Sequence, residues 1–161
     1  MFNFKIENYL KLIFIICSIS IFSAYYIEYV LGHQPCNLCL IERIPYGLSV
    51  ALIITMFIFS KNGRFFVMML ILTFIFSFVI SIYHLGIEQG FIQESTVCGV
   101  KDFTESMSKE DLIKQLNEKI VSCKDVTFRI FGLSLTSINI VISLFFIITL
   151  GKIYTTYEKN R

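Results

Sequence analysis

Four long apolar segments, separated by shorter polar stretches, set the pattern of this chain. They run over Leu12–Leu31, Ile44–Ser60, Phe65–Tyr83 and Ile130–Leu150. A helix that crosses the hydrocarbon core of a bilayer needs about 20 mainly apolar residues, within a range of about 17–25. All four segments meet that requirement. The pattern therefore predicts an all-α membrane protein in which four transmembrane helices form one integral membrane domain over residues 1–161.

The polar stretches differ in length and define the loops. On one side of the membrane the pattern predicts a short loop over residues 32–43 and a long loop over residues 84–129, and on the other side a tight turn at Lys61-Asn62-Gly63-Arg64. Within the long loop, Ser108-Lys109-Glu110-Asp111 resembles a helix-capping box. Apolar and charged residues then alternate at helical spacing as far as Ile120. We expect an amphipathic helix there, either lying on the membrane surface or packed on the end of the bundle.

The composition agrees with a membrane protein and weakens the alternatives. Hydrophobic residues make up 55% of the 161 residues, and tryptophan is absent. The mean hydropathy is +0.71. A soluble domain of this size could not bury four such helices. We expect Cys17, within the first segment, to be an ordinary buried thiol.

The distribution of charge predicts the orientation. The two ends of the chain and the turn between the second and third segments carry seven cations and two acids, whereas the long loop carries six cations and eight acids. Positive charge is concentrated on the cytoplasmic side of membrane proteins. We therefore expect both termini in the cytoplasm and both cysteine-bearing loops outside, where disulfides persist. No nucleic-acid partner is expected.

The candidate chemistry begins at Pro35-Cys36-Asn37-Leu38-Cys39, just before the second apolar segment. Proline suits a first helical turn, so we expect a helix that starts near Cys36. Arg43 would then lie one turn beyond Cys39 on the same face. A helix N-terminus and a nearby cation both stabilise a thiolate. The motif predicts a reactive dithiol with Arg43 beside it.

A second pair, Cys98 and Cys123, lies in the long loop, where we expect a soluble protein to reach it. Four cysteines could hold zinc, but the second close-spaced pair typical of such sites is missing. Haem attachment would need a histidine in place of Leu40. Two static structural disulfides are a more serious alternative, although a bridge across so few residues adds little stability. We favour redox exchange and expect no metal ligands.

His84 lies at the outer end of the third segment. An ionisable residue at membrane depth points to function, although a surface histidine at a helix end is an equal alternative.

These features together resemble the DsbB family of bacterial inner-membrane proteins that generate disulfides. The resemblance covers the whole layout, and its most specific part is Cys36-Asn37-Leu38-Cys39-Leu40-Ile41-Glu42-Arg43. A second match places Cys123 before Phe131-Gly132-Leu133-Ser134 at the start of the fourth span.

The resemblance implies a route for electrons. A reduced periplasmic thioredoxin-fold oxidant of the DsbA kind would attack a Cys98–Cys123 disulfide and form a mixed disulfide with Cys98. Cys123 would exchange with Cys36, and Cys39 would pass electrons to a membrane quinone, ubiquinone or menaquinone, held near Arg43. A family histidine near the end of the third span also contacts the quinone, and in this chain His84 is the candidate.

Two other functions fit part of the sequence. Proteins similar to vitamin K epoxide reductase also combine four helices, a Cys-x-x-Cys pair and a quinone, but their pair follows the loop cysteines. A tetraspan scaffold would use its cysteines as static bridges, and the Cys-Cys-Gly signature of tetraspanins is absent. Thiol-dependent quinone reduction separates the enzymes from the scaffold.

Overall fold

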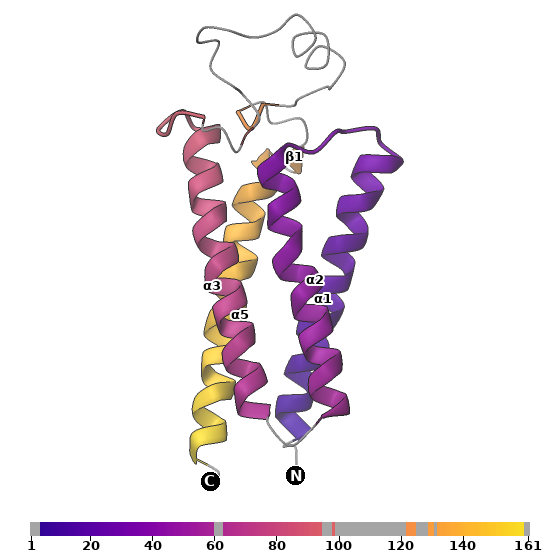
Figure 1. Ribbon diagram of the computed structural model, residues 1–161, viewed down its shortest axis with the longest axis vertical. Helices are drawn as coiled ribbons and strands as arrows, with labels where there is room; N and C mark the ends of the chain where they lie inside the picture. Colours follow the sequence, from indigo (N-terminus) through magenta and orange to yellow (C-terminus); the bar gives the residue numbers. More distant parts are fainter. Residues whose placement is uncertain are drawn as a thin grey trace, which may run out of the picture.

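Four helices run side by side along the long axis of the molecule (Figure 1). The computed structural model describes residues 4–59, 63–94, 98, 122–124, 129–130 and 132–159. The helices are α1 (Phe4–Tyr29), α2 (Asn37–Ile58), α3 (Gly63–Glu88) and α5 (Leu135–Lys159). Each is long and apolar enough to cross a membrane. The prediction of an all-helical, four-span bundle is confirmed.

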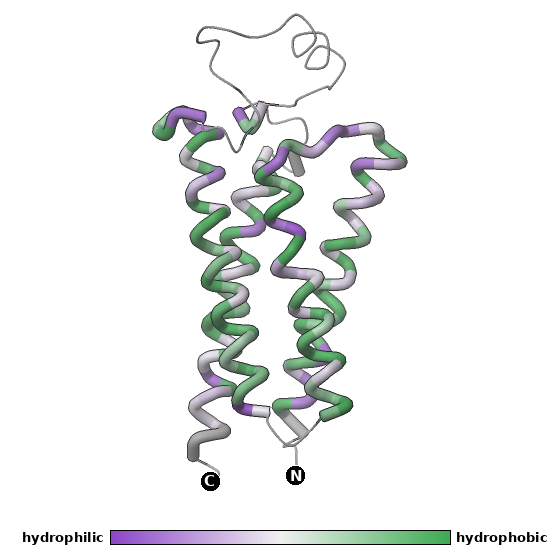
Figure 2. Tube along the Cα trace, viewed as in Figure 1, coloured by the Kyte–Doolittle hydropathy of each residue, from purple (hydrophilic) through white to green (hydrophobic). Residues whose placement is uncertain are grey.

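The two ends of the bundle differ. The N-terminus of α1 and the C-terminus of α5 lie at one end, and the connections from α1 to α2 and from α3 to α5 lie at the other (Figure 1). We call the second end the loop end. Apolar residues cover most of the helices, and hydrophilic residues gather towards the two ends (Figure 2). This arrangement places both cysteine-bearing segments on the same side of the bundle.

Two helices begin at other residues than the apolar segments that they contain. Helix α1 begins at Phe4 rather than Leu12. The polar residues before the apolar run continue the helix, and Lys11 Nζ pairs with Glu7 Oε1 at 2.7 Å one turn away. Helix α5 begins at Leu135 rather than Ile130, because the preceding residues form a small hairpin.

The hairpin joins β1 (Arg129–Ile130) to β2 (Leu133–Ser134) in antiparallel register. Gly132 in its turn has a φ of 82°, a conformation that glycine adopts without the steric cost of a side chain. The Ser134 hydroxyl then accepts a hydrogen bond from the Ser137 amide at 3.2 Å, which caps the first turn of α5.

The amphipathic helix expected near residues 108–120 lies outside the described residues, as does the middle of the turn between α2 and α3. Both stay predictions.

The core has an apolar half and a polar half. Towards the termini, the four helices pack through large side chains. The rings of Phe74 and Phe146 meet edge-on, with their centres 4.7 Å apart. Cys17 is fully buried in this cluster, as expected. Many large apolar side chains, such as Phe22 and Val79, are exposed on the outside of the helices. A surface of this kind suits lipid rather than water.

Towards the loop end, hydrogen bonds connect the helices across the core. Asn139 on α5 donates to the Ser81 hydroxyl on α3 at 2.7 Å and accepts from the Tyr46 hydroxyl on α2. One turn deeper, the hydroxyls of Ser143 and Ser77 are 3.2 Å apart. Hydroxyl and amide groups of this kind link transmembrane helices because lipid offers them no other partner. They fix the spacing of the three helices that surround the cysteine pair.

Candidate functional site

The first cysteine of the Cys-x-x-Cys pair is the N-cap of α2. Cys36 has extended backbone angles (φ −72°, ψ 167°), and its Sγ accepts the backbone N–H of Cys39 at 3.3 Å. The helix therefore begins where the sequence predicted. Pro35 lies before the cap rather than in the first turn, so the role we expected for it is wrong.

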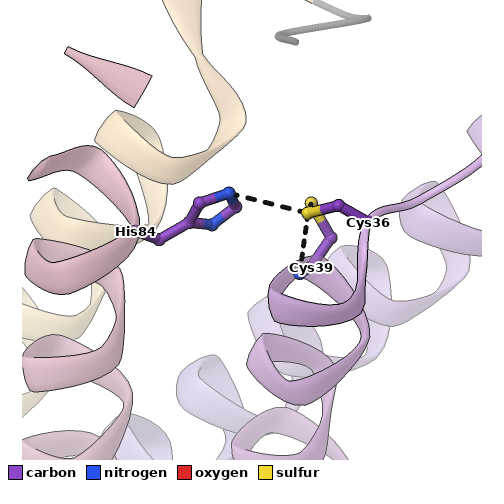
Figure 3. Close-up of side chains that lie close together, drawn as sticks. All are labelled: Cys36, Cys39 and His84. Carbon is purple, nitrogen blue, oxygen red and sulfur yellow. Dashed lines mark hydrogen bonds between the residues drawn. The ribbon is translucent and has the colours of Figure 1, made fainter. Parts of the chain in front are cut away.

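The two sulfur atoms of the pair face each other as free thiols. Cys36 Sγ and Cys39 Sγ are 2.9 Å apart, and His84 Nε2 on α3 lies 3.6 Å from Cys36 Sγ (Figure 3). The hydrogen bond from the Cys39 thiol lowers the pKa of Cys36 to about 5 despite the opposing effect of burial, and the hydrogen bond from His84 and its charge lower it further. Cys36 is thus a thiolate at neutral pH. The sequence predicted a thiolate at this helix end but assigned it to Cys39.

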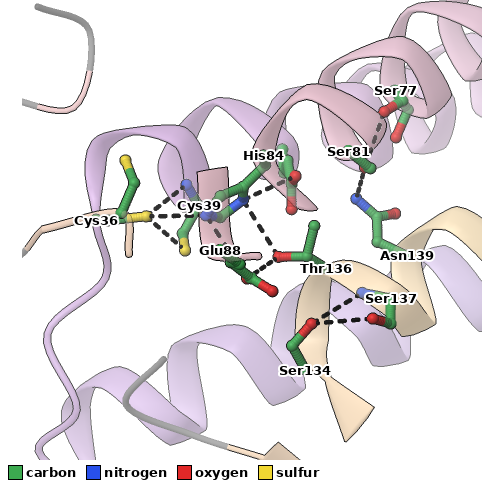
Figure 4. Close-up of polar contacts among 12 residues, drawn as sticks. Cys36, Cys39, Ser77, Ser81, His84, Glu88, Ser134, Thr136, Ser137 and Asn139 are labelled. Atoms are coloured by element: carbon green, nitrogen blue, oxygen red, sulfur yellow. Dashed lines mark hydrogen bonds and ion pairs between the residues drawn. The ribbon is translucent and has the colours of Figure 1, made fainter. Parts of the chain in front are cut away.

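His84 is held in a fixed orientation by three polar neighbours (Figure 4). Its Nδ1 lies 3.1 Å from Glu42 Oε1 and 3.2 Å from Thr136 Oγ1. The Thr136 hydroxyl donates to Glu88 Oε1 at 2.6 Å. The side chain of His84 is almost completely buried, so the alternative of a surface histidine is wrong. With Nδ1 directed to Glu42, the other ring nitrogen faces the sulfur of Cys36.

The side chain of Arg43 is directed towards α1. Its guanidinium pairs with Glu28 Oε2 of α1 at 2.5 Å, and its Cζ lies 5.2 Å from the centre of the Tyr25 ring. Arg43 does share a helix face with Cys39, as the spacing predicts. Glu28 draws its charge towards α1, however, and the group in contact with the thiolate is His84.

Cys98 and Cys123 form a disulfide, with their Cα atoms 5.6 Å apart. Both residues are buried in a cluster with Cys36, Leu38 and Ile87 at the loop end. The structure thus brings all four predicted cysteines to one place. It contradicts the expectation of an exposed bridge, since the apolar ends of α2 and α3 cover it.

Hydrogen bonds also hold the return segment of the long loop. The carboxylate of Glu94 accepts the Lys124 amide at 2.8 Å and the Ser122 hydroxyl.

A cavity of about 300 Å³ opens beside the cysteine pair. Its walls are mainly apolar and come from α1 and α5, with Ile19, Ile27, Ile138 and Ile142 among them. Its polar lining is concentrated at the loop end, where Arg43 and His84 line it together with Cys36 and Cys39. Apolar walls with a few convergent polar groups are typical of a site for a small apolar ligand that carries polar atoms.

Four functional candidates escaped the sequence reasoning. Glu42 belongs to the quoted motif but received no role, and Glu28 lies near the end of the first apolar segment, where a charged residue can reach water without any functional role. Glu88 and Thr136 gave no signal, because each is a single polar residue at the edge of an apolar run.

Two comparisons with known proteins bear on this geometry. The family model "Disulfide bond formation protein DsbB" matches residues 7–153. The chain is also 28% identical over 162 residues to the uncharacterized protein RP370 of Rickettsia prowazekii strain Madrid E, and the match covers 98% of this chain and 94% of that relative. The family match spans all four helices and every cysteine of the site, so this chain belongs to the DsbB family of disulfide bond formation proteins.

Proposed function

We propose that this protein oxidises a periplasmic DsbA-like thioredoxin-fold protein and passes the two electrons to a membrane quinone. One observation carries the proposal: a free dithiol with a stabilised thiolate, a second cysteine pair that is bridged, and an apolar cavity meet at one end of the bundle. The DsbB family as a whole generates disulfides.

The cysteine pairs carry out the exchange. A thiolate of the reduced partner attacks Cys98, and the Cys98–Cys123 bond breaks with Cys123 leaving as the thiolate. Cys123 attacks Cys36 of an oxidised Cys36–Cys39 pair, and Cys39 leaves. The second thiol of the partner attacks its own sulfur bonded to Cys98, which releases the partner as a disulfide. Cys98 then attacks Cys123 and restores the bridge, so that one disulfide has moved and Cys36 and Cys39 are both reduced.

The reduced pair must then lose two electrons and its remaining protons. Cys36 is already a thiolate, and burial of its neighbours keeps water away from the reacting sulfurs. His84, fixed by Glu42, sits where it stabilises the charge on Cys36. Arg43 and His84 are the groups placed to bind the polar end of a ligand in the cavity.

The fit to a quinone rests on that cavity, whose apolar walls suit a lipid-soluble ring and whose polar groups suit its oxygens. A bound quinone supplies a two-electron acceptor. Such an acceptor must be strong, because the DsbA couple lies at about −120 mV, above most dithiols. Ubiquinone and menaquinone both satisfy the chemistry of the site.

The experiment that tests this function uses purified protein, a reduced DsbA-like partner and a soluble quinone analogue. We expect quinone reduction that depends on the partner and disappears in Cys39→Ser. Cys17→Ser is the matched control, since Cys17 lies in the apolar core and does not line the cavity. A static scaffold would reduce no quinone in any variant.

We propose further that the loop end faces the periplasm, with both termini in the cytoplasm of the bacterial inner membrane. The termini share one end of the bundle, and the cation asymmetry supports the assignment. An impermeant thiol reagent applied to intact cells should label a cysteine introduced at Phe91, which is 87% exposed at the loop end. A cysteine introduced at Asn62 should stay unlabelled until the membrane is opened, and the reverse result would overturn this orientation.

A further inference from the structure

Three metal-ligating atoms converge at the end of α2 and α3. The ligand atoms of Cys36, Cys39 and His84 all lie within 4.8 Å of one another. This group is not the four-cysteine zinc site that was disfavoured from the sequence. It includes His84 and does not include the bridged Cys98–Cys123 pair. We propose that the reduced Cys36–Cys39 pair and His84 form a zinc site, which holds the protein in a reduced, inactive state.

The distances suit a tetrahedral ion. Zinc bonds of about 2.3 Å to sulfur and 2.0–2.1 Å to nitrogen place neighbouring ligand atoms roughly 3.5–3.8 Å apart. His84 Nε2 and Cys36 Sγ are already 3.6 Å apart. The two sulfurs, at 2.9 Å, must separate by just under 1 Å, which a small side-chain rotation of Cys39 provides.

The surroundings of His84 are those of a metal ligand. Histidine ligands usually donate their second ring N–H to a carboxylate, which fixes the ring and its tautomer. Here Glu42 accepts from Nδ1 at 3.1 Å, leaving Nε2 directed to the sulfur. The chain therefore already has the carboxylate–histidine arrangement of a zinc site.

Glu88 lies just outside this group and could become the fourth ligand only after a movement of its side chain. Its Oε1 lies 3.8 Å from His84 Nε2. Its Oε2 is buried and has no hydrogen-bond partner within the described part of the chain. An unpaired buried carboxylate oxygen is costly unless a cation or a donor satisfies it. Zinc bound beside His84 would satisfy it.

The site exists in only one redox state. Zinc binds the two sulfurs as thiolates and His84 through an unprotonated Nε2, so binding releases the Cys39 proton and the Nε2 proton of His84 to solvent. When the pair is a disulfide, neither sulfur is a thiolate and the site is lost. Conversely, when zinc is bound, the lone pairs of the two thiolates are coordinated to the ion and cannot form the disulfide bond. Zinc should therefore trap the reduced protein and leave the oxidised protein untouched.

The test measures binding directly, using full-length protein in detergent with Cys98→Ser and Cys123→Ser, so that the only thiols near the loop end are those of the site. We expect the reduced protein to bind one Zn²⁺ in competition with a chelator. Co²⁺ should give the absorption bands of a tetrahedral ion with thiolate charge transfer. The same protein oxidised to the Cys36–Cys39 disulfide should give neither signal.

Matched variants identify the ligands. His84→Ala should weaken Zn²⁺ binding and alter the Co²⁺ spectrum, whereas Cys17→Ser, at a thiol buried in the apolar core, should change neither. Glu42→Gln should weaken Zn²⁺ binding by about 10- to 100-fold, as loss of a carboxylate behind a ligating histidine does. Reduced wild-type protein serves as the check that the two serines have not disturbed the site.

Equal binding by the oxidised and reduced forms would overturn the proposal, as would unchanged binding in His84→Ala. The readout needs neither quinone nor partner, so its failure is distinct from failure of the proposed function. If both proposals hold, Zn²⁺ should also inhibit quinone reduction, and a chelator should restore it.

Discussion

The two cysteine pairs of this protein lie in one cluster but differ in redox state and in the polarity of their neighbours. Cys36 and Cys39 are free thiols on a helix end, with a histidine and two carboxylates behind them. Cys98 and Cys123 are bridged, 25 residues apart, and covered by the apolar ends of α2 and α3. One pair is free and can change its protonation, whereas the other is bonded and, in the proposed function, is the bond that the partner opens.

The difference shows that the surroundings of each pair, rather than the presence of sulfur alone, determine its chemical properties. The charge on Cys36 is stabilised by neighbours on two helices. The bridge instead needs access, because thiol–disulfide exchange requires an attacking sulfur to reach the bond in line. Since the bridge is buried, the proposed exchange requires that docking of the partner first uncovers Cys98.

The largest expected effect separates the two loop cysteines. In Cys123→Ser, Cys98 has no internal sulfur to displace the partner, so a covalent complex with a reduced single-cysteine partner should accumulate. In Cys98→Ser no such complex should form, and turnover with the partner should be lost. Non-reducing gels of both variants measure this, and an adduct that forms through Cys36 or Cys39 would contradict the division of roles.

The next effect concerns the acidity of Cys36. Because its pKa is about 5, its rate of alkylation should be nearly constant from about pH 8 down to pH 6 and should fall below pH 5 as the thiolate is protonated. Cys39→Ala removes the largest cause of the lowered pKa and His84→Ala a smaller one, so both variants should move the pH profile towards higher pH, Cys39→Ala further.

If the pKa of Cys36 rises by about 1, the thiolate fraction at a pH below both pKa values falls about tenfold. The measurement is the rate of iodoacetamide labelling, read at Cys36 by mass spectrometry. Cys17→Ser is the control and should leave the profile unchanged, because Cys17 lies in the apolar core. An unchanged profile in both site variants would show that the helix end alone makes Cys36 acidic.

A smaller effect should arise at Arg43. Arg43→Ala should raise the apparent quinone KM by about tenfold and slow turnover, because a charge-assisted hydrogen bond in a poorly hydrated site is worth roughly 1.5–3 kcal/mol. Glu28→Gln should change KM less, since Glu28 acts by holding Arg43 in position. Arg43→Lys keeps the charge and should recover only part of the affinity. Unchanged kinetics in Arg43→Ala would remove it from the site.

The smallest effect tests the support behind the free pair. Asn139→Leu removes hydrogen bonds to α2 and α3 without adding a charge. Bonds of this kind between membrane helices contribute about 0.6 kcal/mol on average and about 1.7 kcal/mol at most. Thermal unfolding in detergent should show that the free energy of unfolding falls by an amount of that size for each bond removed. The Cys98–Cys123 bridge should still form.

The sequence predicted what depends on local pattern. Four apolar runs predicted the four helices, and the Pro-Cys-x-x-Cys pattern predicted a helix start near Cys36, which is the N-cap of α2. Helix ends were less well placed, since polar residues at the start of α1 and the hairpin before α5 carry no hydropathy signal. The pairing of Arg43 with Glu28 could not be predicted, because it joins two helices and the sequence does not show how each helix is rotated about its axis. The same holds for Glu42 on α2 and His84 on α3, 42 positions apart, whose contact only the packed bundle shows.

The N-cap of α2 also limits how this protein can change over evolution. Serine, aspartate and asparagine are the preferred residues at such a position, and cysteine is not among them. The sulfur of Cys36 serves as the cap and is also the atom that reacts in the proposed exchange. A mutation to serine would keep or improve the helix end and end the chemistry. Selection for stability and selection for activity therefore act in opposite directions on this single atom.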